Sequence, residues 1–349
     1  MARIERNGDG VVELYGRDLI TTQDWSVDEI LASIELAKKL KTTVKKGERP
    51  SRVLDRKNFF MIFYAPSTRT RGAFEAATAI LGGHPAFIDV STTRLKAGEA
   101  AKDVARMYDA YADGIGIRIL DKSIDYVYGA GLAVVKLFAD TAKVPVVNMA
   151  CCTYHPTQAI GDLMTIQNKL GNVKGKKYTI TWAYADQPRG RCSIQAEVLI
   201  ATRFGMDVVL ACPPGFEIDP KIIESAKTNA KASGGSFDVS HEFEDSLKSA
   251  NVVFPRNWAS SEFLRVGASK FGVEREVEIH NKYKNWRLEQ RHVDDLMAKP
   301  AFVTHVLPVL RGQEATDEVM DGSNSVIYEQ AEDNFYAKMA VIALTMGEK

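Results

Sequence analysis

The chain has 349 residues, enough for two domains of ordinary size with a substantial core in each. Its 45 lysines and arginines balance 45 aspartates and glutamates, so no global field attracts nucleic acid or an acidic membrane. No apolar run approaches the roughly 20 residues that span a bilayer, and residues 1–7 are not followed by the apolar core of a signal peptide. These features predict a cytoplasmic globular protein that binds neither nucleic acid nor a membrane.

The first half of the chain alternates between strand and helix patterns. Apolar residues at helical spacing indicate a helix over 24–46. Residues 59–64 are bulky and apolar, as in a fully buried strand, Pro66 ends the run, and helical spacing continues from Ser67 to Leu81. The next predicted elements are a strand over 85–90, a polar loop over 91–99, a helix over 99–112, and strands over 114–118 and 144–149.

A second alternating series follows a long helix that His155 opens and that runs to about Leu170. Its predicted elements are strands over 178–184, 206–212, 251–254 and 301–306, and helices over 193–204, 219–233 and 328–346. The alternation predicts an α/β fold of two doubly wound parallel-sheet domains. We expect the first domain to span 1–152 with the helix of 326–349 packed back on it, an inter-domain helix over 153–170, and the second domain over 171–325.

Five polar residues follow the buried strand where a helix begins: Ser67, Thr68, Arg69, Thr70 and Arg71. A helix N-terminus offers unpaired backbone N–H groups and a positive dipole end, and hydroxyls and guanidiniums add donors that suit phosphate oxygens. The alternative is a capped helix with solvent-exposed arginines. We favour the anion site.

Other polar residues follow other predicted strand ends, namely Arg118, Asn148, His155 and the segment 305–308. Ligands of open parallel sheets bind beyond the carboxyl ends of the strands. We therefore expect these residues to converge on one crevice between the two domains.

Cations and neutral donors, without an acidic pair, indicate an anionic substrate whose reaction builds up negative charge. A helix start lowers the pKa of His155, which then acts as a neutral donor to a carbonyl-like oxygen. Gln158 lies one turn further on and can contact an adjacent amide. Acyl transfer from an acyl phosphate fits this pattern, although His155 alone is equally explained as a structural cap.

These motifs resemble those of the aspartate/ornithine carbamoyltransferase family, and the resemblance covers nearly the full chain. It rests on residues 67–71, Arg118, the His-Pro-Thr-Gln of 155–158, the His-Val-Leu-Pro of 305–308, and residues 325–332. The resemblance implies an active site in the inter-domain cleft and homotrimers with active sites at subunit interfaces. Lys96 would reach a neighbour's site, although an exposed lysine in a mobile loop is an equal alternative.

The resemblance also implies carbamoyl phosphate as substrate, with direct amine attack and no covalent intermediate. It implies that Arg69, Arg118 and His155 are catalytic. The residues implied to bind carbamoyl phosphate are Ser67, Thr68, Arg69, Thr70, Arg71, Lys96, Arg118, His155, Gln158 and, through its backbone carbonyl, Leu307.

The acceptor region departs from two branches of the family. Residues 257–261 read Asn-Trp-Ala-Ser-Ser where ornithine enzymes have Asp-x-x-Ser-Met-Gly, and Val306 stands where they have cysteine. In aspartate enzymes an arginine directly follows the His-x-Leu-Pro motif. In this chain the arginine comes later, at Arg311. The chain is similar to a clade with an unsettled acceptor, tied to purine or allantoin nitrogen breakdown. The candidate acceptor residues are Asn148, Arg189, Arg191, Arg256, Trp258 and Arg311, although surface arginines are common.

Arginines favour an acceptor that bears a carboxylate, because their fork matches it in a bidentate way. An oxamate-type or amino-acid acceptor fits, and the residues are compatible with either direction, including formation of carbamoyl phosphate from a ureido compound. One alternative function is a non-catalytic homologue that acts as a scaffold for a partner enzyme. A dinucleotide-dependent enzyme is disfavoured because no G-x-G-x-x-G follows a strand.

The four cysteines, Cys151, Cys152, Cys192 and Cys212, show neither C-x-x-C nor histidine-paired spacing. Reduced thiols are the simplest interpretation. We therefore expect no metal and no cofactor.

Overall fold

The computed structural model describes residues 12–347, so residues 1–7, on which the signal-peptide argument rests, lie outside the described part. The chain divides into two compact units. The first comprises Met1–Ile124, Gly129–Gly161 and Glu332–Lys349, and the second Asp125–Tyr128 and Asp162–Ala331. Each unit contains one β-sheet with helices, and all the strand pairs are parallel. This arrangement confirms the predicted fold class.

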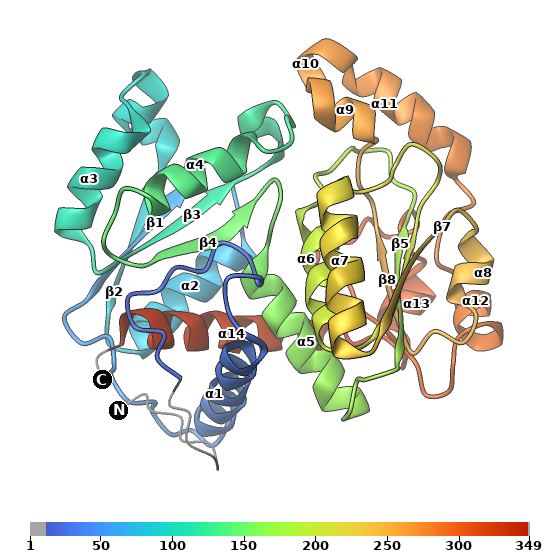
Figure 1. The fold of residues 1–349 in the computed structure, drawn as a ribbon, viewed down its shortest axis with the longest axis horizontal. Helices are drawn as coiled ribbons and strands as arrows, with labels where there is room; N and C mark the ends of the chain where they lie inside the picture. The colour runs from blue at the N-terminus through green and yellow to red at the C-terminus, as the bar shows by residue number, and fades with distance from the viewer. Residues whose placement is uncertain (1–11, 348–349) are drawn as a thin grey trace. The chain divides into compact units, whose positions relative to one another are not determined.

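The first unit contains a four-stranded sheet in the order β2-β1-β3-β4 (Figure 1). Its strands are β1 (Asn58–Phe63), β2 (His84–Asp89), β3 (Gly114–Ile119) and β4 (Val146–Cys151). Its helices are α1 (Val27–Lys45), α2 (Arg69–Ile80), α3 (Ala101–Tyr111) and α4 (Ala130–Ala139), with short 3-10 turns η1 (Val90–Thr92), η2 (Arg94–Ala97) and η3 (Asp121–Ile124). Helices α5 (Pro156–Leu170) and α14 (Ile327–Met346) each begin in one unit and continue into the other.

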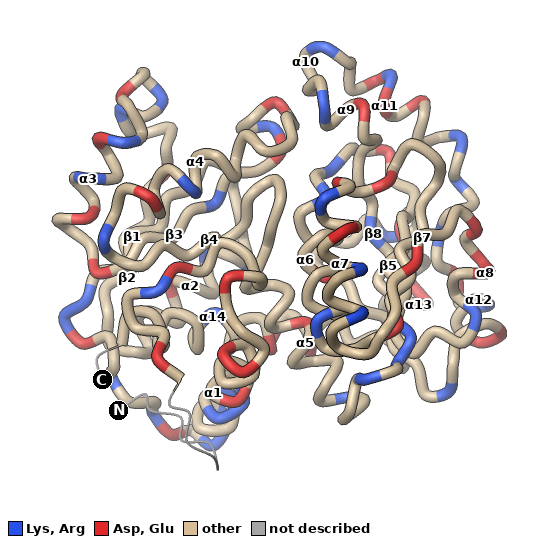
Figure 2. The backbone as a smooth tube through the Cα atoms, in the orientation of Figure 1, with Lys and Arg blue, Asp and Glu red and all other residues tan. Residues whose placement is uncertain are grey.

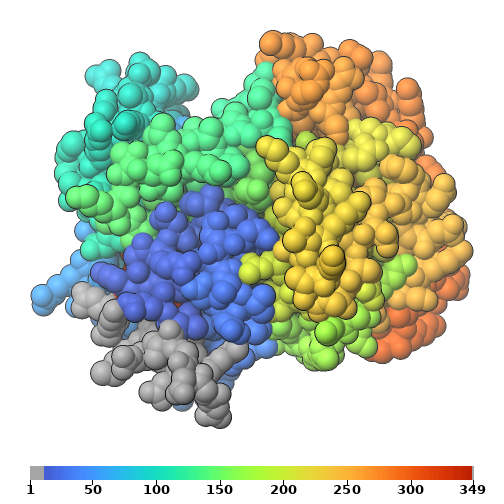
Figure 3. Space-filling view, viewed as in Figure 1, coloured from blue at the N-terminus to red at the C-terminus, as the bar shows by residue number. Residues whose placement is uncertain are grey.

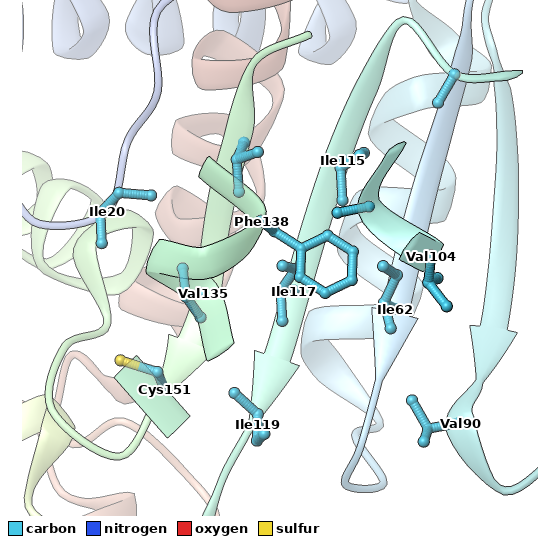
Figure 4. Packing of buried hydrophobic residues seen from close by; sticks show 13 residues of the cluster. Ile20, Ile62, Val90, Val104, Ile115, Ile117, Ile119, Val135, Phe138 and Cys151 are labelled. Atoms are coloured by element: carbon cyan, nitrogen blue, oxygen red, sulfur yellow. The ribbon is translucent and has the colours of Figure 1, made fainter. Parts of the chain in front are cut away.

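Helices α3 and α4 cover one face of this sheet (Figure 4). Ile115, Ile117 and Ile119 point toward that face, because alternate residues of a strand share a side. Phe138 and Val135 of α4 pack against them, and all five side chains are buried. This packing fixes β3, whose carboxyl end carries Arg118.

The opposite face of the same sheet is packed closely by α2 and other helices. The Phe59 ring of β1 lies 5.6 Å from the Phe74 ring of α2. A methyl group at Gly116 of β3 would lie only 2.7 Å from Phe59, so this strand position requires glycine. A methyl at Gly161 of α5 would likewise lie 2.7 Å from the Asn334 Cα of α14. The terminal helix thus packs directly on the start of α5.

The second unit contains a five-stranded sheet in the order β7-β6-β5-β8-β9 (Figure 1). Its strands are β5 (Lys177–Trp182), β6 (Asp207–Ala211), β7 (Ser236–Ser240), β8 (Val252–Arg256) and β9 (Phe302–Val303). Its other elements are α6 (Cys192–Arg203), α7 (Pro220–Ser233), α8 (Phe243–Leu247), α9 (Ser261–Val266), α10 (Ala268–Phe271), α11 (Val273–His280), η4 (Asn281–Tyr283), α12 (Gln290–Asp295) and α13 (Asp317–Asp321). Side chains of its central strand, β5, form hydrogen bonds with helices on both faces of the sheet. Tyr178 donates to Glu197 of α6 at 3.2 Å, and Thr179 donates to the Ser246 carbonyl of α8 at 2.7 Å.

Helix α7 shows how local sequence sets these elements. The Asp219 side chain accepts from the backbone of Lys221 at its start, and Gly234 ends it with a φ of 79°. Ile222 and Ala226 lie one turn apart on its buried side. Its other side is at the surface, in yellow in Figure 3.

The predicted strand over 301–306 is shorter in the structure, where β9 has two residues. The chain leaves the ladder at His305, whose N–H donates to the Gln330 side chain at 2.8 Å. Helix α4, strand β7 and the short helices α8 to α13 lie outside the predicted elements. A strand over 236–240 with only one buried residue lacks the apolar run that marks the other strands.

The charges of the described residues are mixed in sign over both units (Figure 2). Lysines and arginines alternate with acidic residues along the helices rather than forming one basic stripe. Within residues 12–347, no helix is both long and apolar enough to cross a membrane.

Candidate functional site

The segment 67–71 lies at the start of α2, as predicted, and directly follows β1. The Ser67 hydroxyl accepts from the Thr70 backbone N–H at 3.2 Å, so part of the capped-helix alternative is correct. Thr68 occupies the N-cap position, and its side chain makes no capping bond. Thr68 and Arg69 are exposed, and this helix end carries no acidic residue in its first turn. An anion can therefore reach the positive end of the helix dipole.

Arg118 brings a second strand end to the same place. It is the register partner of Phe63, the last residue of β1. Its Nη1 donates to the Thr70 hydroxyl at 3.3 Å, and its carbonyl accepts from Tyr64 at 2.9 Å. This bond joins the carboxyl end of β3 to the start of α2, which follows β1 in the chain.

His155 immediately precedes α5 and is buried. Burial holds the pKa of its imidazole well below the usual range, and the cations Lys338 and Arg118 lower it further. The expected direction is thus correct, but burial, not the helix start, is its main cause. Nδ1 of His155 finds no hydrogen-bond partner among the described residues. A neutral ring with one unsatisfied nitrogen is suited to bind a ligand atom.

Gln158 and Lys96 occupy contrasting places in the first unit. The Gln158 side chain is buried, and its backbone N–H donates to the His155 carbonyl at 3.2 Å. Lys96 is exposed on η2. The pKa of the Asp89 carboxyl is lowered mainly by two hydrogen bonds from Ser91. The nearby Lys96 cation lowers it further.

The Arg71 guanidinium is already engaged by neighbouring side chains. It donates to Glu75 at 2.8 Å and lies 3.6 Å from the centroid of the Phe87 ring. It borders a cavity of about 550 Å³ whose lining residues are Phe63, Tyr64, Ala65, Pro66, Ser67, Thr68, Arg71, Phe87, Asp89 and Ser91. Arg71 therefore shapes the wall of this cavity with a guanidinium that Glu75 and Phe87 already engage.

Three of the expected acceptor residues are engaged by other groups of the protein. The Asn148 amide is buried and donates to the Ile20 carbonyl at 2.8 Å. Trp258 is buried, and its Nε1 donates to the Phe216 carbonyl at 2.6 Å, so its ring fills the interior of the second unit. Arg311 binds two carboxylates, those of Asp317 at 2.6 Å and Asp321 at 2.7 Å.

Arg256 belongs to a buried ion pair that the sequence did not reveal. Its Nη1 lies 3.3 Å from Glu314 and 3.0 Å from the Pro308 carbonyl. Glu314 also accepts from the backbone N–H groups of Asn257, at 2.8 Å, and Leu310, at 2.7 Å. Burial alone would raise the pKa of Glu314, but Arg256, His305 and the Leu310 bond hold it well below its usual range.

His305 and Leu307 lie on the other side of the same carboxylate. His305 Nε2 is 3.4 Å from Glu314, and its Nδ1 accepts from the Leu307 N–H at 2.9 Å. Leu307 has a φ of 48°, a strained conformation for this residue type. Glu314 therefore positions both the loop of 305–308 and the segment after β8.

Arg191 contacts a backbone carbonyl, a hydroxyl and an aromatic ring. Its Nη1 donates to the Glu217 carbonyl at 2.7 Å and lies 3.3 Å from the Ser261 hydroxyl, while its guanidinium lies 4.6 Å from the centroid of the Tyr128 ring. Arg189 lies near enough to His305 to help lower its pKa, after burial. The carboxyl end of the second sheet thus gathers three arginines, and Arg256 among them pairs with a buried carboxylate.

Comparison with known proteins gives two family matches that together cover most of the chain. Residues 17–168 match the carbamoyl-P binding domain of aspartate/ornithine carbamoyltransferase, and residues 176–345 match its Asp/Orn binding domain.

Similar proteins match over nearly their whole length. The anabolic ornithine carbamoyltransferase of Pyrococcus furiosus is 38% identical over 97% of this chain and 98% of its own. The N-acetylornithine carbamoyltransferase of Xanthomonas campestris is 32% identical over 95% of this chain and 98% of its own. The crystal structure of acetylornithine transcarbamylase complexed with acetylcitrulline superposes with a TM-score of 0.86, at 30% identity over 95% of this chain and 100% of that one. The structure of the Pyrococcus furiosus ornithine carbamoyltransferase superposes with a TM-score of 0.85, at 36% identity over 97% of this chain and 100% of that one.

Proposed function

The chain belongs to the aspartate/ornithine carbamoyltransferase family of enzymes, and on this premise we propose that it transfers the carbamoyl group of carbamoyl phosphate to a nitrogen of a small carboxylate-bearing acceptor. The first unit would bind carbamoyl phosphate and the second the acceptor. The observation that carries the proposal is the bond from Arg118 to Thr70, which holds a guanidinium at the N-terminus of α2. We also propose a homotrimer in which Lys96, exposed on η2, reaches the site of a neighbouring copy.

The chemistry would need no side-chain nucleophile. The acceptor nitrogen attacks the carbamoyl carbon, the C–N bond forms, the C–O bond to phosphate breaks, and the nitrogen gives up a proton to the departing phosphate. Negative charge develops on the carbonyl oxygen and on phosphate, where the neutral His155 ring and Arg118 can stabilise it. Arg69, Ser67 and Thr68 would add donors at the helix end.

The charge distribution of the second unit supports a narrower acceptor class. Arg191 and Arg189 can bind a carboxylate. The two buried carboxylates near segment 257–260, Glu276 and Glu314, are occupied by protein donors, so a cationic α-ammonium would gain little from them. We therefore favour an acceptor that has a carboxylate and a neutral α-nitrogen, such as an acylated amino acid or oxamate.

A substrate panel tests this preference. With carbamoyl phosphate saturating, we expect the better of N-acetyl-L-ornithine and oxamate to exceed L-ornithine in kcat/KM by about tenfold or more, equivalent to about 1.4 kcal/mol. Carbamoylated product is measured directly by mass spectrometry. A higher kcat/KM for L-ornithine would contradict the acceptor class. The assay is repeated with Arg191→Ala, in which we expect the acceptor KM to rise more than that for carbamoyl phosphate.

A further inference from the structure

A buried pair in the second unit, Glu276 and His280, lies on one side of α11. Neither side chain is exposed to solvent. The pair sits four residues apart, with His280 Nε2 at 3.1 Å from Glu276 Oε1. Burying a charged group costs free energy unless its polar atoms find hydrogen-bond partners. The partners of Glu276 and His280 therefore indicate the role of the pair.

Glu276 binds the loop that follows β8. The Ser260 backbone N–H donates to Glu276 Oε1 at 2.5 Å, and the Ser260 hydroxyl donates to Oε2 at 2.7 Å. Ser260 in turn caps α9, because its side chain accepts from the Phe263 N–H. One carboxylate thus fixes the end of segment 257–260 and the entry to the next helix.

His280 binds the loop that follows β5. Its Nδ1 lies 2.8 Å from the Ala185 carbonyl, which can only accept, so Nδ1 carries a proton. Its Nε2 faces a carboxyl oxygen of Glu276 at 3.1 Å. The ring is packed between Trp182, at 5.4 Å between centroids, and Phe216, at 5.5 Å. Its orientation is therefore fixed by two hydrogen bonds and two aromatic neighbours.

The two loops held by this pair are themselves neighbours. Strands β5 and β8 are adjacent and parallel, pairing Trp182 with Arg256 at their carboxyl ends. The Asn257 amide donates to the Ala183 carbonyl at 3.2 Å. Ala259 donates to the Arg189 carbonyl at 2.9 Å. The carboxyl edge of a parallel sheet is where ligands bind, and Arg189, Arg191 and Arg256 all lie on or beside these loops.

We infer that Glu276 and His280 are positioning residues that hold the loops after β5 and β8 together, and thereby fix the arginines that receive the acceptor. The inference rests on the proposed carbamoyl transfer and extends it to two residues with no expected role of their own in binding. A misplacement of about 1 Å in such a loop can cost about 100-fold in rate. The effect should fall on the acceptor and leave carbamoyl phosphate binding intact.

The test compares Glu276→Gln and His280→Asn with Glu278→Gln. Glu278 lies on the same helix and is exposed, so its substitution removes an equal charge without touching either loop. In the first two variants we expect the KM for N-acetyl-L-ornithine or oxamate, whichever the wild type uses better, to rise about tenfold or more. We expect kcat to change less and phosphonoacetate affinity to stay within about twofold. An unchanged acceptor KM, or an equal loss of phosphonoacetate affinity, would overturn the inference.

Hydrogen exchange provides a readout that does not depend on turnover. We expect faster amide exchange in peptides covering both 183–191 and 257–261 in the two pair variants, and wild-type exchange in Glu278→Gln. Exchange that rises in only one loop would contradict the coupling. If the wild type bound phosphonoacetate but used neither acceptor, the acceptor class would fail while exchange still decided the role of the pair. A variant that unfolds is replaced by the other, since each breaks the same arrangement from one side.

Discussion

Arg118→Ala is expected to lower kcat/KM for carbamoyl phosphate by about 1,000-fold, with the fold retained. Arg118 is the charged group that joins the end of β3 to the Thr70 hydroxyl at the start of α2. It also lies close enough to His155 to help keep that ring neutral. Its loss should remove charge stabilisation where negative charge develops on the leaving phosphate. Steady-state kinetics, with circular dichroism to check folding, measures the effect.

Arg71→Ala provides the matched control. Arg71 belongs to the same polar segment, but its guanidinium is engaged by Glu75 and by the Phe87 ring. We expect its loss to cost at least about tenfold less in kcat/KM than the loss of Arg118. Equal losses in the two variants would show that both guanidiniums contact the anion. A loss in Arg118→Ala of only a few-fold would contradict the assigned site.

Glu314→Ala is expected to lower the free energy of unfolding by about 3–5 kcal/mol, because it leaves Arg256 buried without its carboxylate. The same change frees the backbone N–H groups of Asn257 and Leu310. We therefore expect a higher KM for the acceptor in the fraction of the protein that stays folded. Chemical denaturation measures the stability. Glu318→Ala removes an exposed carboxylate from the neighbouring helix and should stay within about 0.5 kcal/mol of the wild type.

The pH dependence of this contribution has a definite sign. The folded pKa of Glu314 is held well below its usual range by Arg256, His305 and the Leu310 bond, despite the opposing effect of burial. A carboxyl with a lowered folded pKa stabilises the protein fully above its unfolded pKa of about 4.3. That contribution is lost as pH falls toward the folded pKa. The stability gap between wild type and Glu314→Gln should therefore narrow below about pH 4, and a gap that widened there would refute the assigned charge state.

The sequence predicts the elements whose apolar pattern is complete. The run of 59–64 predicts β1 because its bulky residues have no polar break, and the spacing of 219–233 predicts α7 almost to the residue. Strand β9 is shorter than its pattern, because a side chain 25 residues later, Gln330, takes the His305 N–H. Such a bond is a tertiary event that no local pattern contains.

Some features of the candidate site can be predicted from the sequence and others cannot. Residues 67–71 and Arg118 can be placed from sequence, because strand ends and helix starts define one edge of a parallel sheet. The buried carboxylates of the second unit cannot be assigned partners from sequence, because Glu314 lies 58 residues from Arg256 and Glu276 lies 16 residues from Ser260. The Arg71–Glu75 pair differs, because its spacing of four on a helix is a local pattern. An arginine's availability to a ligand thus depends on carboxylates that spacing does not reveal.

Calorimetric titration of phosphonoacetate, a mimic of carbamoyl phosphate, into the purified protein tests whether the start of α2 binds the anion. We expect binding in the wild type, near-wild-type binding in Arg71→Ala, and loss of measurable binding in Arg118→Ala. No binding to the wild type at millimolar ligand, or undiminished binding to Arg118→Ala, would contradict the anion site at the start of α2. The former result would favour a non-catalytic scaffold.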